Sequence, residues 1–212
     1  MTTGPANAPV AFLCAHGAGA GMETPLLSAI AALLAERGLT TYRFEFGYMA
    51  ARRLGARKPP PKAERLTQEY RAAVAALSAG VPLIIGGKSM GGRVASLVAD
   101  ELYREGRVLG LACLGYPFHP PKKPEQLRTA HLMALRCPAL IVQGERDPFG
   151  TRAEVASYGL SPAIRMHWAC DGDHDLGPRG GSGFTRKGNL AQAADAIAEF
   201  AKSAAGGAMG RV

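Results

Sequence analysis

The stretch GGKSMGG at residues 86–92 supports two interpretations that lead to unrelated folds. Taken as Gly87-Lys88-Ser89, it looks like the end of a phosphate-binding loop, whose lysine and serine hold nucleotide phosphates and Mg²⁺. Taken as residues 87–91, it matches G-x-S-x-G, a sharp turn that presents a serine between a strand and a helix. The sequence on either side of the stretch decides between the two.

A phosphate-binding loop requires G-x-x-x-x-G-K-[ST], so its first glycine would fall at position 82. That position holds Pro82, and residues 83–86 read Leu-Ile-Ile-Gly, which is typical of a buried strand. A strand cannot curl around phosphates. The sequence therefore argues against the phosphate-binding loop.

The serine turn fits its surroundings better. Strand-like residues precede Ser89, and the amphipathic pattern of residues 92–102 follows it. Gly87 and Gly91 leave room for the close approach of the chain that such a turn requires. The alternative is that Ser89 only caps the helix, and the strand–turn–helix context favours a nucleophile.

The chain alternates between apolar segments and amphipathic segments, which predicts strands separated by helices. The strands are expected at residues 8–17, 39–46, 82–87, 108–115, 137–144 and 163–170. The helices are expected at residues 22–38, 63–77, 91–106, 151–159 and 189–204, with a helical turn near residue 131. Loops are expected at the basic, proline-rich residues 47–62 and at residues 116–125, and fraying at residues 204–212.

Strands that alternate with helices build a parallel sheet covered by helices on both faces. We therefore expect a three-layer α/β/α sandwich with about six mainly parallel strands. The length of 212 residues suits a single domain over residues 1–212, with flexible ends at residues 1–8 and 205–212. Ligands bind such sheets at the carboxyl ends of the strands, so every loop that follows a strand is a candidate for chemistry.

The composition is that of a globular protein in a reducing compartment. With 47% hydrophobic residues the chain can bury a substantial core. Its four cysteines form no C-x-x-C pair, and three lie in or beside apolar segments, which favours reduced thiols over disulfides or zinc ligands. The N-terminal residues do not look like a signal peptide, and no apolar run is long enough to span a membrane. A cytoplasmic protein without membrane contact is the expectation.

A serine hydroxyl is a poor nucleophile until a base takes its proton, and that base needs an orienting acid. In this kind of fold the chain order is serine, then Asp or Glu, then His. Asp147 follows the strand at residues 137–144, and His174 follows the strand at residues 163–170. Both are thus expected at the same sheet edge as Ser89. Glu145 is a rival for the acid, and either Asp147 or His174 can instead be an ordinary turn residue.

The developing oxyanion needs two backbone N–H donors. One is expected from Met90, the residue after the nucleophile. The other should come from the loop HGAGAG after the first strand, with Ala18 as first choice and Gly17 as second. His16 is expected to support this loop by hydrogen bonding. A Cys170–His174 dyad is a minor alternative, since no sharp turn presents that cysteine.

These residues resemble the α/β-hydrolase family over nearly the whole chain. The stretches HGAGAGM, GGKSMGGR, GYPFHPP, QGERDPFG and GDH are most similar to a small subfamily related to dienelactone hydrolases, which contains testis-expressed-type proteins and a subunit of the non-specific lethal chromatin complex. The resemblance implies Ser89, Asp147 and His174 as a catalytic triad. It implies no particular substrate.

Substrate-binding residues are expected within the same stretches, at His16, Gly17, Lys88, Tyr116 and Phe118. No insertion long enough for a helical cap follows the strand at residues 108–115, so we expect an open site without a cap domain.

The net charge of +8 is unevenly distributed. Three loops at residues 47–63, 115–124 and 177–188 carry ten basic residues and no acidic ones: Arg52, Arg53, Arg57, Lys58, Lys62, Lys122, Lys123, Arg179, Arg186 and Lys187. Such a rim can be merely solvated. The hypothesis is that it attracts an anionic substrate, or an acidic protein or nucleic-acid surface. Nucleic acid is disfavoured because few aromatic residues accompany the charges.

Together these patterns predict a serine hydrolase that cleaves small or accessible carboxylic esters, with no metal and no organic cofactor. The alternative is a non-catalytic interaction module that keeps the fold and a vestigial triad, in which case a protein partner would be its ligand. A peptidase would need a domain that restricts access to the site, and this chain has no room for one.

Overall fold

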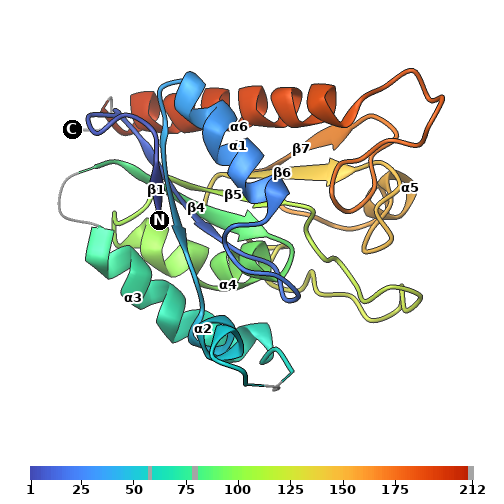
Figure 1. The fold of residues 1–212 in the computed structure, drawn as a ribbon, viewed down its shortest axis with the longest axis horizontal. Helices are drawn as coiled ribbons and strands as arrows, with labels where there is room; N and C mark the ends of the chain where they lie inside the picture. Colours follow the sequence, from blue (N-terminus) through green and yellow to red (C-terminus); the bar gives the residue numbers. More distant parts are fainter. Residues whose placement is uncertain (57–58, 78–80, 210–212) are drawn as a thin grey trace.

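The computed structural model describes residues 1–56, 59–77 and 81–209. They form one seven-stranded sheet with helices on both of its faces (Figure 1). The strand order is β1-β3-β2-β4-β5-β6-β7. The strands are Thr2–Thr3 (β1), Ala11–Ala15 (β2), Thr40–Phe44 (β3), Leu83–Lys88 (β4), Gly110–Leu114 (β5), Ala139–Gly144 (β6) and Ile164–Ala169 (β7). Neighbours from β3 to β7 are parallel, and only the β1–β3 pair is antiparallel among these strands. The expectation of a mainly parallel sheet is confirmed.

The edge strand β1 was not expected, because two residues are too few to show a pattern. Thr2 pairs with Tyr42 and Thr3 with Thr41 of β3. The N-terminal residues are therefore attached to the sheet edge in this structure, while the flexibility expected for residues 1–8 stays a prediction.

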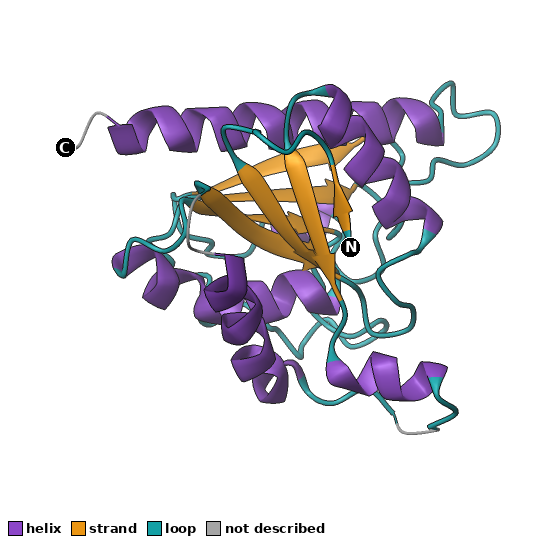
Figure 2. Ribbon diagram, turned by 60° about the vertical axis from the view of Figure 1, so that its left-hand side comes forward, coloured by secondary structure: helices purple, strands orange, loops and turns teal. Residues whose placement is uncertain are grey.

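Each central strand sends alternate side chains to opposite faces of the sheet, and this creates two apolar cores. In β2, Leu13 belongs to one core, and Phe12 and Cys14 belong to the other. The first core is covered by α3 (Thr67–Leu77) and α4 (Met90–Arg104), the second by α1 (Pro25–Glu36) and α6 (Arg186–Met209). Figure 2 shows the sheet between these two helical layers. The three-layer α/β/α arrangement is confirmed.

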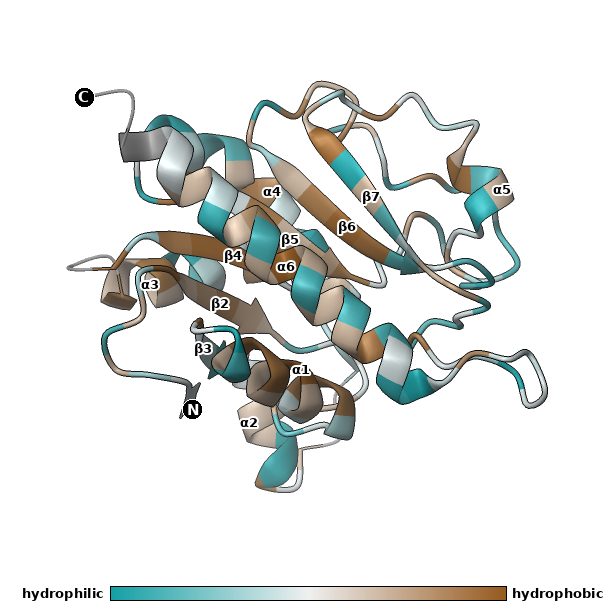
Figure 3. Ribbon diagram, turned by 90° about the horizontal axis from the view of Figure 1, so that it is seen from above, coloured by the Kyte–Doolittle hydropathy of each residue, from teal (hydrophilic) through white to brown (hydrophobic). Residues whose placement is uncertain are grey.

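Helix α6 lies diagonally over the sheet and packs against α1 (Figure 3). Its buried residues Ala193, Ala194, Ile197 and Ala201 recur at helical spacing, so one stripe of the helix faces the core. The helix continues to Met209, although the sequence predicted fraying from residue 204. Residues 210–212 lie outside the described residues.

The prediction of a loop at residues 47–62 is wrong for its first seven residues. Helix α2 spans Gly47–Arg53, and Met49 is buried within it. The N–H of Gly47 donates to Glu69 Oε2 over 2.7 Å, which ties the first turn of α2 to α3. The prolines that suggested a loop follow this helix, and residues 57 and 58 lie outside the described part of the chain. A 3-10 turn, η1 (Ala63–Leu66), then leads into α3.

No helix lies between β5 and β6, so no cap covers the sheet edge there. The expected fold without a cap domain is confirmed. None of the helices in the described part of the chain combines the length and the apolar character that crossing a bilayer requires.

Candidate active site

Ser89 lies on the sharp turn between β4 and α4, with φ 51° and ψ −116°. This left-handed φ is uncommon for a residue with a side chain and marks a strained turn. Gly87, at φ +156°, is also in a region that favours glycine. A Cβ on Gly91 would lie 2.5 Å from the carbonyl oxygen of His16, so only glycine fits there without movement. The turn can form because Gly87 and Gly91, two residues before and two residues after Ser89, lack a side chain.

The structure brings Ser89, His174 and Asp147 into one hydrogen-bonded chain. His174 Nε2 lies 3.0 Å from Ser89 Oγ, and His174 Nδ1 lies 2.8 Å from Asp147 Oδ2. Because an ionised carboxylate can only accept, Nδ1 carries the proton and donates to Asp147. Nε2 is then free to accept the hydroxyl proton of Ser89. This geometry is the one required of a nucleophile, a general base and an orienting acid.

Asp147 has no exposed surface, and its carboxylate is held from several sides. Its Oδ1 accepts from the N–H of Phe149 at 2.9 Å, and its Oδ2 accepts from Gln143 Nε2 at 3.0 Å as well as from His174. The ring of Phe149 lies against that of His174, with the ring centroids 4.3 Å apart. These contacts fix the position of the carboxylate and of the imidazole.

Gln143, the penultimate residue of β6, is a site residue that the sequence did not reveal. It is fully buried. Its Oε1 accepts from the N–H of Tyr116 at 2.7 Å, and its Nε2 lies within hydrogen-bonding distance of the carbonyl oxygens of Tyr116 and Gly150 as well as of Asp147. One amide thus joins Asp147 to the loops after β5 and β6. A glutamine at the end of an apolar strand was the only available signal.

Glu145, the rival acid, does not contact His174. Its carboxylate accepts from the N–H of Asp171 at 2.9 Å and from Arg152 at 2.7 Å. These bonds lower the pKa of Glu145, the Asp171 N–H most strongly. Glu145 therefore holds the loop that carries His174 rather than the histidine itself.

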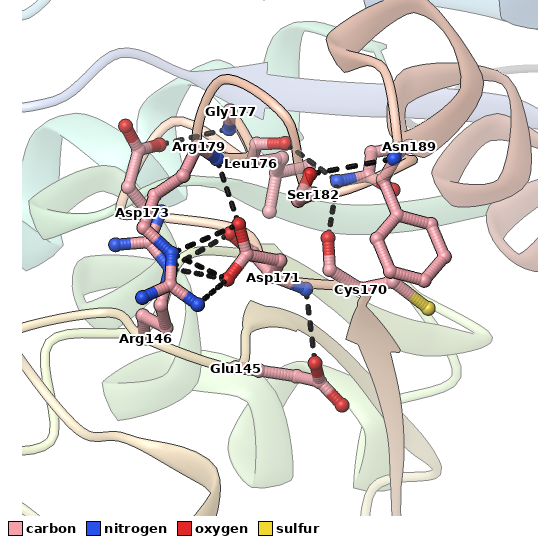
Figure 4. A network of polar contacts seen from close by, with 11 residues as sticks. Glu145, Arg146, Cys170, Asp171, Asp173, Leu176, Gly177, Arg179, Ser182 and Asn189 are labelled. Atoms are coloured by element: carbon pink, nitrogen blue, oxygen red, sulfur yellow. Dashed lines mark hydrogen bonds and ion pairs between the residues drawn. The ribbon is translucent and has the colours of Figure 1, made fainter.

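That loop is tied down by the polar network drawn in Figure 4. Asp171, at φ 48°, pairs with Arg179 at 2.6 Å and with Arg146 at 2.9 Å. The hydrogen bonds from Arg179 hold the pKa of Asp171 at about 2. Asn189 Nδ2, from α6, donates to the carbonyl oxygens of Cys170 and Leu176 at 3.0 and 2.9 Å. The network anchors both ends of the turn that presents His174.

On the other side of Ser89, the loop after β2 is held by two side chains. His16 Nε2 accepts from the N–H of Phe46 at 3.1 Å, so Nδ1 carries the proton and donates to the carbonyl oxygen of Gly17 at 2.6 Å. Tyr48, on α2, has its hydroxyl 3.3 Å from the Gly17 carbonyl oxygen and 3.1 Å from that of Ala18. Burial lowers the pKa of His16, consistent with a neutral ring. The roles of Ala18 and Gly17 as oxyanion donors stay predictions.

Two hollows meet at Ser89. The first has a volume of about 450 Å³ and is lined by Ala18, Pro61, Lys62, Ala63, Glu64, Ser89, Met90, Arg93, Pro117, Arg128 and Phe149. The second has a volume of about 540 Å³ and is lined by residues that include Gly17, Ala18, Leu27, Lys88, Ser89, Phe149, His174, Asp175 and Arg186. A third hollow, of about 590 Å³, lies between the C-terminal parts of α4 and α6, and none of the site residues lines it.

Three of the expected substrate-binding side chains do not reach either hollow. His16, Tyr116 and Phe118 are fully buried, and the two aromatic rings belong to the core between α4 and the sheet. They support the site from beneath, because a side chain without exposed surface offers a substrate nothing to contact. Gly17 and Lys88 do line the second hollow.

Lys88 is largely buried beside His174 and lies 3.3 Å from Asp175 Oδ1. Burial lowers the pKa of Lys88, and the carboxylate of Asp175 opposes this shift. The ion pair therefore compensates the buried ammonium in the second hollow.

The basic loops are only partly directed at the site. Arg53 pairs with Glu45 at 2.6 Å, and Arg179 with Asp171. Lys62 lines the first hollow and Arg186 the second, whereas Arg57 and Lys58 lie outside the described residues. Two further cations in the first hollow, Arg93 and Arg128, come from segments outside those loops. Arg93 follows Ser89 by one helical turn, and that spacing was a signal that sequence reasoning could have used.

The remaining thiols and imidazoles form no second site of this kind. His174 has both ring nitrogens engaged by Ser89 and Asp147, and within the described residues it makes no hydrogen bond to Cys170. Ser96 Oγ lies 2.8 Å from His131 Nε2 but also donates to the carbonyl oxygen of Arg93. His131 must then donate to Ser96, so it cannot act as a base toward it. The described residues contain no group of three or more side chains arranged as metal ligands.

Residues 8–202 match a protein family described as an alpha/beta hydrolase domain. Solved structures with a similar fold include an alpha-beta serine hydrolase homologue from Coxiella burnetii, at TM-score 0.70 and 18% identity over 94% of this chain and 89% of that one. A dienelactone hydrolase from Anabaena variabilis superposes at TM-score 0.70 and 21% identity, covering 94% and 88% of the two chains. An α/β serine hydrolase without a lid from Xanthomonas campestris gives TM-score 0.68 and 16% identity, covering 95% and 87%.

Proposed function

Because the chain belongs to the alpha/beta-hydrolase family, we propose that it is a serine hydrolase that cleaves carboxylic esters. The observation that carries this proposal is the continuous hydrogen-bonded chain from Ser89 through His174 to the buried Asp147. Nothing in that geometry needs rearrangement before a proton moves from serine to imidazole.

In the proposed reaction, Ser89 Oγ attacks the ester carbonyl carbon while His174 Nε2 takes the hydroxyl proton. Asp147 stabilises the resulting imidazolium and keeps Nδ1 protonated. The tetrahedral intermediate collapses when His174 returns the proton to the leaving alkoxide, which departs as an alcohol. His174 then takes a proton from water, whose oxygen attacks the acyl carbon. The bond between that carbon and Ser89 Oγ breaks, His174 returns the proton to Oγ, and the carboxylic acid leaves.

The oxyanion is proposed to bind the N–H groups of Met90 and Ala18. Met90 is the first residue of α4, so its N–H has no partner within the helix and points out of its positive end. Ala18 lines both hollows together with Ser89, whereas Gly17 lines only the second. This difference favours Ala18 as the second donor.

An ester is the favoured substrate because the site is open and built for acyl transfer. In the part of the chain that the structure describes, no cap encloses the hollows beside Ser89, so small or accessible esters can enter from solvent. Esters also require less help for departure of the leaving group than amides, since an alkoxide leaves more readily than an amide anion.

Replacement of Ser89 tests its role as the nucleophile. Ser89→Ala should lower kcat for a 4-nitrophenyl ester by about 10⁴-fold or more and abolish labelling by a fluorophosphonate probe. Steady-state kinetics and intact-protein mass spectrometry measure the two effects.

The matched control is Ser96→Ala, which removes a second serine hydroxyl that contacts a histidine, His131. It should keep the labelling. A folded wild-type protein that neither labels nor turns over any ester would contradict the proposal and favour an interaction module with a vestigial triad.

A further inference from the structure

The two hollows beside Ser89 differ in their access to the general acid. His174 lines the second hollow and does not line the first. In the proposed reaction the leaving alkoxide must receive its proton from His174 Nε2, so the alcohol part of the ester belongs on the side of the second hollow. The first hollow, which contains Met90 and Ser89, is then left for the acyl group. We call it the acyl-side hollow.

The acyl-side hollow is basic. Among the described residues, its lining contains three cationic side chains, Lys62, Arg93 and Arg128, and one carboxylate, Glu64. Arg93 and Glu64 form an ion pair. That pair leaves Lys62 and Arg128 without a compensating charge from the described residues that line the hollow. The second hollow differs, since its buried Lys88 is paired with Asp175.

Arg128 is the cation whose environment most requires a partner. No carboxylate in the described part of the chain lies within ion-pair distance of it, and it is only partly exposed. Burial and then the neighbouring positive charge of Arg93 lower the pKa of Arg128. The same Arg93, after burial, lowers the pKa of His131. Arg93 and Arg128 both line the acyl-side hollow, and Glu64 is its one carboxylate among the described residues.

A bound anion would relieve this repulsion. In a partly buried site the interaction of a carboxylate with arginine is stronger than on an exposed surface, because less water screens it. Within the described residues the guanidinium of Arg128 makes no hydrogen bond, so it can bind a carboxylate through two parallel hydrogen bonds, whereas Arg93 already donates to Glu64. The hollow therefore offers one complete anion-binding side chain and a second cation beside it.

We propose that the acyl-side hollow binds a carboxylate at the far end of the acyl group, through Arg128 with the support of Arg93. The inference rests on the proposed esterase function and specifies its substrate class as monoesters of dicarboxylic acids. The products are an alcohol and a dicarboxylate.

The kinetic test compares two esters of equal chain length. The 4-nitrophenyl monoester of adipic acid carries the distal carboxylate, and 4-nitrophenyl hexanoate lacks it. Wild-type protein should prefer the adipate monoester in kcat/KM, and Arg128→Gln should reduce this preference by about 10- to 100-fold, the value of a hydrogen bond to a charged group. Arg136→Gln removes the same charge from an exposed position before β6, at the opposite sheet edge, and should leave the preference unchanged.

A second pair of esters places the charge on the alcohol. 4-Acetoxybenzoate and phenyl acetate share an acyl group and differ in a carboxylate on the leaving group. A preference for 4-acetoxybenzoate that Arg128→Gln removes would overturn the assignment of the acyl side. Equal turnover of the adipate monoester and the hexanoate by wild-type protein, at both low and high salt, would overturn the inference while leaving the esterase function intact.

A binding measurement separates the two proposals. Adipate should bind the Ser89→Ala protein in isothermal titration calorimetry, and the added Arg128→Gln change should weaken its affinity by about tenfold or more. Absence of adipate binding overturns the carboxylate site whether or not any ester is cleaved. Adipate binding by a wild-type protein that fails to react with the fluorophosphonate supports the site and contradicts only the hydrolase proposal.

Discussion

At the scale of single residues, the proposed triad depends on two buried polar side chains, Asp147 and Gln143, whose hydrogen bonds are made within the protein. Asp147 has no exposed surface and accepts three hydrogen bonds, from Phe149, Gln143 and His174. A buried carboxylate without such donors would be strongly disfavoured as an ion. Of these three donors, Phe149 uses its backbone N–H and His174 belongs to the proposed triad. Substitution of Gln143 can therefore test how much its hydrogen bond to Asp147 contributes.

Gln143→Leu keeps the volume of the side chain and removes its amide. The change should lower kcat by about tenfold and leave KM nearly unchanged, because Asp147 loses a donor that fixes its orientation toward His174. It should also lower the free energy of unfolding by about 1–3 kcal/mol, since the N–H of Tyr116 loses its acceptor. Steady-state kinetics and urea unfolding measure these effects.

The control for this substitution is Gln126→Leu, which changes an exposed glutamine outside the site. A loss of stability in Gln143→Leu without any fall in kcat or in the rate of fluorophosphonate labelling would show that Gln143 is structural only.

At the scale of elements, the site is shaped by a helix that the sequence did not predict. Helix α2 follows β3 and places Tyr48 against the loop after β2. The Tyr48 hydroxyl and the ring of His16 together hold the carbonyl groups of Gly17 and Ala18. Because a peptide unit is planar, fixing these carbonyls also orients the N–H groups of the following residues.

Tyr48→Phe removes this anchor and retains the aromatic ring. We expect kcat to fall about three- to tenfold with little change in KM, since a looser loop places the oxyanion donors less accurately. The matched control is Tyr42→Phe on β3, whose hydroxyl makes no hydrogen bond to the described residues. An unchanged kcat in Tyr48→Phe would show that the Tyr48 hydroxyl on α2 does not position the oxyanion donors.

At the scale of the whole molecule, the sheet order gathers the site from distant segments. The loop after β2 is the proposed oxyanion loop, and the loops after β4, β6 and β7 carry Ser89, Asp147 and His174. In a parallel sheet the carboxyl ends of these strands meet at one edge. The network of Asp171 with Arg146 and Arg179 connects the loops after β6 and β7 at that edge. Loss of these ion pairs should therefore lower the free energy of unfolding.

Asp171→Asn should destabilise the protein at neutral pH and much less in acid. The folded-state pKa of Asp171, about 2, lies below the value of about 3.9 expected in the unfolded chain. Its carboxylate therefore stabilises the fold fully above that upper value, and the contribution is lost as the pH falls toward 2. Asparagine also tolerates the left-handed φ of 48°, so the backbone is preserved.

Urea unfolding of both proteins between pH 7 and pH 3 measures this difference. The gap in unfolding free energy should shrink as the pH falls, while Glu125→Gln, which changes an exposed carboxylate, should show no such trend. A gap that stays constant with pH would mean that the ion pairs of Asp171 do not stabilise the fold.

The alternation of strands and helices was readable because burial sets the period of apolar residues in each element. The apolar period did not predict the short elements β1 and α2. The two residues of β1 show no period, and α2 was hidden by the basic, proline-rich sequence that follows it. In both cases contacts with β3 or α3, rather than local pattern, hold the segment.

The sequence by itself determined a three-layer fold and the order of Ser89, Asp147 and His174, because apolar periodicity and the glycines of the sharp turn are local properties. Only the tertiary structure decided that Asp147 rather than Glu145 faces His174, that Gln143 holds it, and that Arg93 and Arg128 share a hollow beside Ser89. Those pairings join segments far apart in the chain. They depend on how the loops pack at one sheet edge, and no local pattern of residues encodes that packing.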